Sequence, residues 1–472
     1  MATAIWWIRR DLRLQDNPAL AAACESGTVV PVYVHAPEEE SPWAPGDASR
    51  VWLRKSLQTL DARLRARGSA LVVRRGPSLA ALRALVQELG AEAVHWNRLY
   101  EPATIARDAG VKEALQGAGL QARSHAASLL FEPWQVQTES GTPYRVFTPF
   151  WRKAQARLET LPPLASPPQR LPGVSGLRSE ALDQVLPAPR PSWDRAFWTD
   201  WEPGEDGAGH ALDAFVDGAL AGYCEERDRP DHIGTSRLSP HLHFGEISPH
   251  RILATLRERV RSAALDADVA GYIRELGWRE FSHHLLFHFP TSAEVDFNPR
   301  FAGFKWATTE PDTLQAWQRG RTGVPIVDAG MRELWHSGWM HNRVRMIVAS
   351  FLCKNLRQHW LHGARWFWDC LLDADLANNT LGWQWSAGTG ADAAPYFRIF
   401  NPVAQARRFD PDGHYVRRWL PELAALPDAA LFAPWEHPEL LRRLAPAYPQ
   451  RPIVDLSQSR AAALAAYRAL RE

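Results

Sequence analysis

The chain has 472 residues, of which 46% are apolar and 23% are charged, and its net charge is +1. These values match an average globular protein and exclude a disordered or fibrous chain. One hydrophobic core usually stops growing at about 250–300 residues, so two or more packed units are expected.

No segment of the sequence has the features of a membrane span, a secretory signal or a zinc site. The longest apolar run, residues 344–353, contains Arg345 and is shorter than the roughly 20 residues of a transmembrane helix. At the N-terminus the basic residues follow the short apolar run, which is the reverse of a secretory signal. The four cysteines form no CxxC pair, as is usual in a reducing compartment. We therefore expect a cytoplasmic protein with no membrane partner and no bound metal.

The first 130 residues alternate short β-rich runs with segments of helical period. Such alternation predicts right-handed crossovers and a parallel sheet covered on both faces, which is a doubly wound α/β domain. Neither GxGxxG nor GxxxxGK[ST] occurs there, so no dinucleotide or nucleoside triphosphate site follows from these motifs. The expected strands are 5–8, 29–34, 70–73 and 93–96, with a fifth near Leu129, and the expected helices are 18–23, 49–67, 78–89 and 104–118.

Residues 131–207 are rich in Pro, Ser and Gly. We interpret them as an interdomain linker that is too proline-rich for regular elements. From residue 208 to 472, segments of helical period follow one another without a convincing strand, so the second domain is expected to be all-α. Its charges are unevenly distributed: residues 317–366 hold eight Lys/Arg against two Asp/Glu. A solvated face and a basic groove for phosphates both remain open.

The stretch 234–249 places three hydroxyls around Arg237 and a proline, Pro240, in the first turn of an expected helix. Hydroxyls and free N–H groups at a helix start suit a phosphate cradle, although an ordinary capped helix would have the same pattern. The stretch 275–281 puts Glu275, Trp278 and Arg279 on one helix face. A surface ion pair beside a core tryptophan would give the same sequence pattern.

The stretch 338–346 places Asn342 and Met346 on one helix face, flanked by arginines. An amide both donates and accepts, as recognition of a base edge requires, whereas a solvated face needs only charge.

The stretch DADLANNTLGWQW, residues 373–385, is interpreted as a loop. In it Asp373 is positioned to pair with Arg345, and Asn379 to present an amide to a heterocycle. Trp383 and Trp385 would alternate across an extended backbone and face opposite sides. A loop whose Asn and Asp only form turns is the alternative.

Together these stretches resemble the photolyase and cryptochrome family. The likeness extends from IWWIRRDLRLQDNPAL, residues 5–20, to FRIFNPVAQARRFDPDGHYVRRWLPEL, residues 397–423. Between them TSRLSPHLHFGEIS, ELGWREF, GRTGVPIVDAGMREL, GWMHNRVRM and DADLANNTLGWQW follow in the family's order. Within the family the chain is similar to repair enzymes for cyclobutane pyrimidine dimers. Asn342 stands where (6-4) repair enzymes and animal cryptochromes typically have a second histidine, and Asn379 where plant-type photoreceptors tend to have Asp.

The resemblance implies a folded, U-shaped FAD in the helical domain. It also implies that Asn379 lies near the flavin N5, and that Tyr272 serves as the aromatic platform where relatives often have Trp. The residues that match the family's FAD-binding positions are Tyr223, Thr235, Ser236, Arg237, Leu238, Ser239, Tyr272, Arg279, Arg345, Asp373, Ala374, Asp375 and Asn379.

The resemblance further implies a deoxyribodipyrimidine photo-lyase, a carbon–carbon lyase acting on UV-damaged DNA. In such an enzyme photoexcited reduced FAD passes one electron to a dimer flipped out of the duplex. Arg227 and Arg343 would hold phosphates. Trp278, Trp385 and Met346 would wall the dimer pocket, and Glu275 and Asn342 would bond the pyrimidines. Trp383, Trp360 and Trp306 match the chain that reduces oxidised flavin.

A second, antenna chromophore is expected on the N-terminal domain, a folate rather than a deazaflavin. Where many folate binders have Asn-Glu, however, this chain has Ala103 and Thr104, so a folate would need another pose. The expected oligomeric state is a monomer. The alternative function is a cryptochrome-type blue-light photoreceptor without repair activity. A flavin oxidoreductase would need a nicotinamide site, which no motif supports.

Overall fold

The computed structural model describes residues 2–174, 176–392 and 397–470. The chain forms two compact units. Unit one consists of Met1–Ala221, Ser236–Pro290 and Leu372–Leu376. Unit two consists of Gly222–Thr235, Thr291–Leu371 and Ala377–Glu472.

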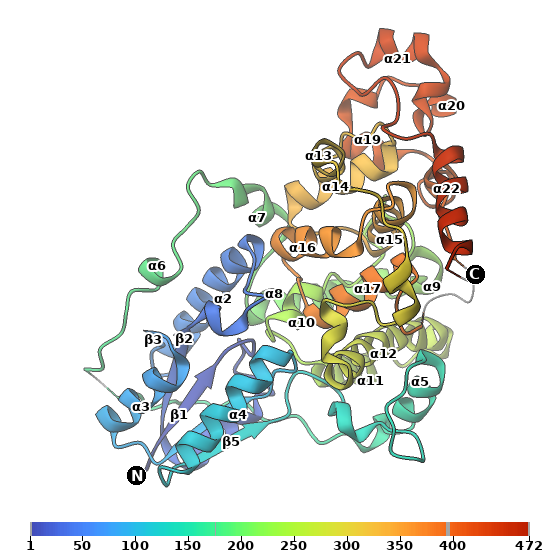
Figure 1. The fold of residues 1–472 in the computed structure, drawn as a ribbon. Coiled ribbons are helices and arrows are strands. Elements are labelled where there is room, and N and C mark those ends of the chain that lie inside the picture. Colours follow the sequence, from blue (N-terminus) through green and yellow to red (C-terminus); the bar gives the residue numbers. More distant parts are fainter. Residues whose placement is uncertain (1, 175, 393–396, 471–472) are drawn as a thin grey trace. The chain divides into compact units, whose positions relative to one another are not determined.

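Unit one contains a parallel sheet of five strands in the order β3-β2-β1-β4-β5 (Figure 1). Ile5 in β1 pairs with Val30 in β2 and with Val94 in β4, so the first strand lies in the middle of the sheet. The strands are β1 (Ala2–Ile8), β2 (Gly27–His35), β3 (Val72–Arg75), β4 (Ala93–Asn97) and β5 (Gln121–His125).

Four helices connect these strands, and the strand order confirms the doubly wound fold. Right-handed crossovers place α1 and α2 on one face of the sheet and α3 and α4 on the other. The Asn17 side chain caps α1 by accepting a bond from the Leu20 N–H at 3.1 Å. The connecting helices are α1 (Pro18–Glu25), α2 (Asp47–Arg65), α3 (Ser78–Leu89) and α4 (Pro102–Gln116).

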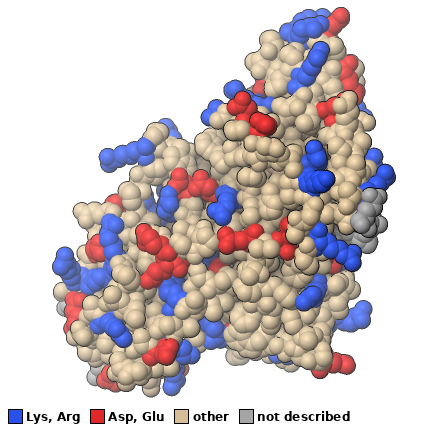
Figure 2. Space-filling model, in the orientation of Figure 1, with Lys and Arg blue, Asp and Glu red and all other residues tan. Residues whose placement is uncertain are grey.

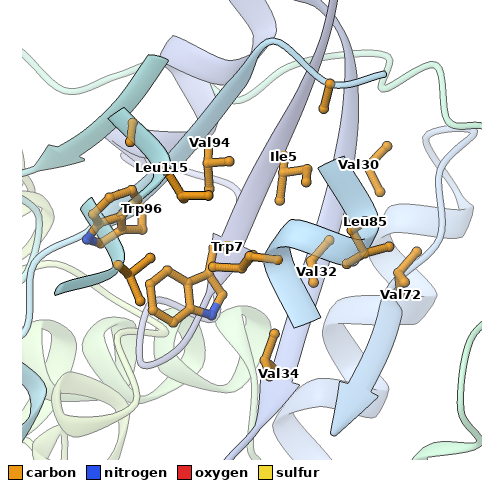
Figure 3. Packing of buried hydrophobic residues seen from close by; sticks show 14 residues of the cluster. Ile5, Trp7, Val30, Val32, Val34, Val72, Leu85, Val94, Trp96 and Leu115 are labelled. Carbon is orange, nitrogen blue, oxygen red and sulfur yellow. The ribbon is translucent and has the colours of Figure 1, made fainter. Parts of the chain in front are cut away.

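Both faces of the central strand are buried, as a parallel sheet requires. Ile5 and Trp7 point to the face covered by Leu85 of α3 and Leu115 of α4, where Trp7 meets Trp96 edge-on at 5.6 Å (Figure 3). This continuous burial explains why the strands read as uninterrupted apolar runs.

The prediction of a fifth strand near Leu129 is wrong, because β5 lies at Gln121–His125. This edge strand has the sequence QARSH and buries only Ala122 among its five residues, so it carries no hydrophobic pattern. The apolar residues beyond it are buried for another reason. The Leu130 and Phe131 N–H groups donate to the Glu280 carboxylate, which holds this loop on a helix of the same unit.

The remaining elements of unit one are helical. The prediction that residues 131–207 carry no regular elements is wrong, because α5, α6 and α7 form within them. Phe147 of α5 lies ahead of the proline-rich part and packs against α12. The bounds are α5 (Phe147–Gln155), α6 (Leu182–Val185), α7 (Phe197–Asp200), α8 (Glu205–Ala214), α10 (Ser239–His243), α11 (Pro249–Arg259) and α12 (Asp266–His288).

Unit two is helical throughout its described part, which confirms the all-α prediction. A π-helical turn at Phe351–Asn355 continues α15. Its helices are α9 (Tyr223–Glu226), α13 (Pro311–Gln318), α14 (Pro325–Ser337), α15 (Asn342–Ser350), α16 (Trp360–Cys370), α17 (Leu376–Ala387, whose first residue belongs to unit one), α18 (Pro402–Phe409), α19 (His414–Trp419), α20 (Asp428–Leu431), α21 (Pro438–Leu444) and α22 (Leu456–Arg468). Across the described residues, no helix combines the length and the apolar character needed to cross a membrane.

The prediction of a loop at residues 373–385 is also wrong, because α17 begins at Leu376. Asp373–Asp375 precede the helix, and Asn379 lies within it. The tryptophans are therefore on helical and not on extended backbone. Residues two apart on a helix differ by about 200° in direction, so Trp383 and Trp385 still point to different sides. Trp383 is buried and Trp385 is partly exposed.

Candidate functional site

Helix α12 carries four of the predicted site residues on 23 residues of uninterrupted helix. Trp278 stacks on Phe147 of α5 with ring centroids 3.7 Å apart and planes at 9°. The segment interpreted as a linker therefore supplies the support for a predicted substrate residue. Glu275 lies one turn before Trp278 and is partly exposed.

The hydroxyl-rich segment next to α10 is tied to α12 within unit one. The Tyr272 hydroxyl donates to Ser236 Oγ at 3.1 Å, and burial raises the pKa of Tyr272 to about 12, so this hydroxyl stays protonated. Pro240 lies in the first turn of α10, as predicted. Arg237 has a φ of 53°, which few residues other than glycine adopt. Its guanidinium lies 4.3 Å from the Trp201 ring centroid.

Two further charged residues of the predicted FAD site in this unit, Arg279 and Asp375, are fixed by protein groups. Arg279 donates to the Ser128 carbonyl at 2.8 Å. The Asp375 carboxylate lies 3.2 Å from His283 Nε2. Burial acts to raise the pKa of Asp375, but His283 and His243 together outweigh it and hold that pKa well below its usual range. The neighbouring Asp373, Ala374 and Leu238 are all buried.

In unit two the predicted phosphate-binding arginines are held against aromatic rings. Arg343 forms an ion pair with Asp228 at 2.5 Å and lies 4.4 Å from the Phe409 ring. Arg227 lies 5.4 Å from the ring of Tyr223, the buried first residue of α9.

The other basic residues of the 317–366 segment are only partly free for a ligand. Arg332 pairs with Glu422 and Arg365 with Glu294. Basic and acidic side chains are interspersed on the face drawn in Figure 2. The two ion pairs favour a solvated, ion-paired surface for Arg332 and Arg365, with Arg343 as a separate candidate contact.

Helix α15 begins at Asn342, which is exposed, and His341 caps it by accepting from the Arg343 N–H at 3.2 Å. Arg345 Nε donates to the Met340 carbonyl at 2.7 Å. Its predicted pairing with Asp373 would join the two units and stays a prediction. Four predicted FAD-binding residues belong to unit two: Tyr223, Thr235, Arg345 and Asn379. That they bind the same FAD as the residues of unit one also stays a prediction.

Met346 and Trp385 line the same cavity in unit two, and their role as walls of a dimer pocket stays a prediction. Lys354 also lines it and was missed by sequence reasoning. Its ammonium donates to the Ala387 carbonyl at 2.5 Å, at the C-terminal end of α17, and lies over the Phe397 ring. Burial lowers the pKa of Lys354 to about 7. The available signal was a lysine that directly follows the apolar run of 344–353.

The three predicted electron-transfer tryptophans all lie in unit two. Trp360 Nε1 donates to Asp296 at 2.8 Å. The His359 ring contacts both Trp360 and the partly exposed Trp306, with ring centroids 5.6 Å and 5.1 Å away respectively. Trp383 packs on Gly363 of α16, where a Cβ atom would overlap the indole ring.

Asn379 is oriented by α16. Its Nδ2 donates to the Ala364 carbonyl at 3.0 Å, which uses one of the two NH₂ hydrogens and fixes the orientation of the amide, including its acceptor Oδ1. Asn379 and Trp383 therefore both depend on the close approach of α16 and α17.

At the N-terminal sheet the strand order reverses between β1 and β4, which is where doubly wound sheets usually bind ligands. In this chain the Arg9 side chain occupies the crevice between β1 and β4. Its guanidinium lies 4.2 Å from the Trp7 ring and donates to Asp108 at 2.9 Å and to the Asn97 carbonyl. A chromophore in this crevice would have to displace a buried ion pair. Thr104 is buried on α4 and bonds to Glu101.

The fold and the site residues define a member of the photolyase and cryptochrome family, and the chain belongs to it. Residues 4–169 match the family described as DNA photolyase, and residues 272–469 match the FAD binding domain of DNA photolyase.

Among individual proteins, the chain is 47% identical to the deoxyribodipyrimidine photo-lyase of Agrobacterium fabrum, over 100% of this chain and 98% of that protein. It is 40% identical to Cryptochrome-1 of Arabidopsis thaliana, over 97% of this chain and 69% of that protein. A bacterial class III photolyase structure from Agrobacterium tumefaciens superposes with a TM-score of 0.94 at 46% identity and covers 100% of this chain and 98% of its own.

The contact between Gly363 and Trp383 makes a prediction about stability. Gly363→Ala should destabilise the protein by about 1–3 kcal/mol, because the new methyl group must displace the indole. Gly382→Ala is the matched control: it lies in α17 with nothing within 4 Å of its Cβ position and should stabilise by about 0.5–1 kcal/mol. Urea unfolding of both variants measures the difference. Equal effects of the two substitutions would show that α16 and α17 do not meet at Gly363.

Proposed function

We propose that this protein is a deoxyribodipyrimidine photo-lyase that repairs cyclobutane pyrimidine dimers in UV-damaged DNA, using FAD and light. The observation that carries the proposal is the arrangement on α12. This one helix presents Tyr272 and Arg279 for the cofactor and Glu275 and Trp278 for the dimer, with Trp278 already stacked on Phe147. Full-length relatives named deoxyribodipyrimidine photo-lyase support it.

The donor set of unit one fits FAD. Ser236 and Arg279 offer hydroxyl and guanidinium donors to a pyrophosphate, and the buried Asp373 and Asp375 offer acceptors to hydroxyl or ring N–H groups. When bound, reduced FAD would supply the light-driven electron that opens the cyclobutane ring. In unit two the Asn379 amide would present its Oδ1 to the flavin N5 region, and Arg345 would supply positive charge.

The chain's own contribution to the reaction is to hold the dimer. A dimer in a duplex must be flipped out before it can reach a buried cofactor, and damage lowers the energy of extrusion. Trp278 and Trp385, with Met346, would wall the pocket, and Glu275 and Asn342 would bond the pyrimidine carbonyl and imide groups. Phe147 fixes the Trp278 ring before DNA arrives, so less ordering entropy is lost on binding.

Arg343 and Arg227 would hold the phosphates that flank the dimer, which positions the DNA without reading its sequence. Arg343 must then exchange its carboxylate partner Asp228 for a phosphate. Trp383, Trp360 and Trp306 would form the route by which an oxidised flavin is reduced, with the His359 ring in contact with the last two.

The proposal also covers the domains, the oligomeric state and the antenna chromophore. We propose residues 1–130 as an antenna domain, 131–207 as a linker and 208–472 as the FAD- and DNA-binding domain. The protein would act as a cytoplasmic monomer. A folate antenna would bind outside the crevice between β1 and β4, because Arg9 and Asp108 fill it.

The second candidate function is a blue-light photoreceptor without repair activity, which the 40% identity to Cryptochrome-1 favours. The deciding experiment illuminates the reduced, purified protein with dimer-containing DNA and follows the loss of dimers, with a dark sample as control. The photo-lyase removes dimers only in the light. Binding of the DNA without any light-dependent loss of dimers would establish the photoreceptor instead.

Trp385→Ala should weaken binding of dimer-containing DNA by about 1–3 kcal/mol, because one stacking wall of the pocket is lost. Its FAD content should not change. Trp335→Ala is the control, since Trp335 is 64% exposed on α14 and has no place in the proposed pocket. Fluorescence anisotropy with dimer-containing and undamaged DNA measures both variants. Unaltered affinity of Trp385→Ala would remove this indole from the pocket.

Trp306→Phe should slow the photoreduction of oxidised flavin, since phenylalanine is much harder to oxidise than tryptophan. Repair by protein that was chemically reduced beforehand should stay at the wild-type rate. Trp193→Phe, at an exposed indole of unit one, serves as the control. Flash photolysis measures the first rate and dimer loss the second. A wild-type rate of photoreduction in Trp306→Phe would exclude it from the route.

A further inference from the structure

Two consecutive buried histidines on α12, His283 and His284, differ in their surroundings. The His283 ring uses both nitrogens: Nδ1 lies 2.9 Å from the Arg279 carbonyl oxygen, and Nε2 lies 3.2 Å from Asp375 Oδ2. The His284 ring uses Nδ1 with the Pro133 carbonyl at 3.1 Å. Its Nε2 has no hydrogen-bond partner within the described part of the chain.

Counting hydrogens assigns a charge to each ring. A carbonyl oxygen and a carboxylate only accept hydrogen bonds, so both nitrogens of His283 must carry a hydrogen. The ring is then an imidazolium and forms a buried ion pair with Asp375. His284 needs one hydrogen only, and a buried ring with one partner is more stable neutral.

The charges around His283 agree with this assignment. Burial acts to lower the pKa of His283, but Asp375 outweighs it, so that the pKa is raised above the ordinary 6.5. Burial lowers the pKa of His284 to about 4. The groups that face the pair are Arg279 and Glu280 of α12, His243 of α10 at 3.9 Å from Asp375, Tyr100 with its ring 6.4 Å from that of His283, and the Arg10–Glu101 ion pair at 2.7 Å.

We propose that His283 is a positioning residue whose imidazolium keeps Asp375 ionised and in place within the FAD-binding segment Asp373–Asp375, so that FAD is retained less well once His283 loses its proton. The proposal rests on the proposed function for the role of Asp375. It adds a residue that touches neither cofactor nor DNA and acts through that carboxylate.

The direction of the pH dependence follows from the raised pKa of His283. The stabilisation from the pair is complete below pH 6.5, the ordinary value, and is lost as the pH rises through the higher folded value. FAD should therefore dissociate faster on the alkaline side. A carboxylate that simply titrates near its usual range would give the opposite trend, with retention lost in acid.

The first test measures the protonation state of the His283 ring. In the full-length, FAD-loaded protein labelled at histidine Cε1, NMR follows each ring with pH, and loss of a signal in His283→Gln or His284→Gln assigns it. We expect His283 to titrate above pH 6.5 and His284 to stay neutral from pH 6.5 upward. A neutral His283 at pH 6.5 would overturn the proposal whether or not FAD is bound.

The second test measures the rate of FAD release from the same purified proteins. His283→Gln removes the cation and should release FAD at least about tenfold faster, the size expected for one charge-assisted hydrogen bond. His283→Arg keeps a cation that does not titrate in proteins, so its release rate should stay independent of pH across the range in which the wild type changes. His284→Gln is the matched control and should leave both the rate and its pH profile unchanged.

The outcomes separate the two proposals. If His283→Gln releases FAD at the wild-type rate, or if His283→Arg keeps the wild-type pH profile, His283 has no positioning role while the proposed function stands. If His283→Gln does not fold, the pH profiles of the wild type and of His283→Arg decide. If the wild-type protein binds no FAD, the proposed function fails and the NMR titration still tests the charge of His283.

Discussion

An ionised side chain can be buried only if the protein supplies a partner for it, and this constraint organises the candidate site. Asp375 has His283, Arg279 has the Ser128 carbonyl, and Lys354 has the Ala387 carbonyl. Each of these partners lies on another segment of the same compact unit. The charged groups that a cofactor or DNA would meet are thus also the groups that tie helices and loops to one another.

The aromatic residues of the site are also held by other segments of the chain, through steric contact rather than through charge. Trp278 is held by stacking on Phe147, and Trp383 is held by the close approach of α16 at Gly363. A large ring packed against a neighbouring segment in this way has little freedom to change its rotamer. In the proposed pocket, a wall held as Trp278 is held would bind a flipped base with little loss of entropy, so the architecture and the proposed chemistry require the same packing.

The sequence predicted the sheet well because buried parallel strands form continuous apolar runs, as at Val29–Val34. It failed at β5, where QARSH is an edge strand with one buried residue. It also failed at residues 376–385, where turn-forming Asn and Gly residues obscured a helix whose stability comes from packing on α16. The motifs led to Tyr272, Asn379 and Trp385. They did not reveal Phe147, Lys354 or His283, because the roles of these residues depend on partners distant in sequence, and no local pattern records such contacts.

The central claim is that the site is held together by the protein's own bonds and not by its ligand. Backbone hydrogen–deuterium exchange of the full-length protein, before and after removal of FAD, tests this claim most directly. The account predicts that the amides of α12 (Asp266–His288) and α17 (Leu376–Ala387) keep slow exchange without FAD. Fast exchange of both helices in the FAD-free protein, slowed only when FAD is restored, would contradict it.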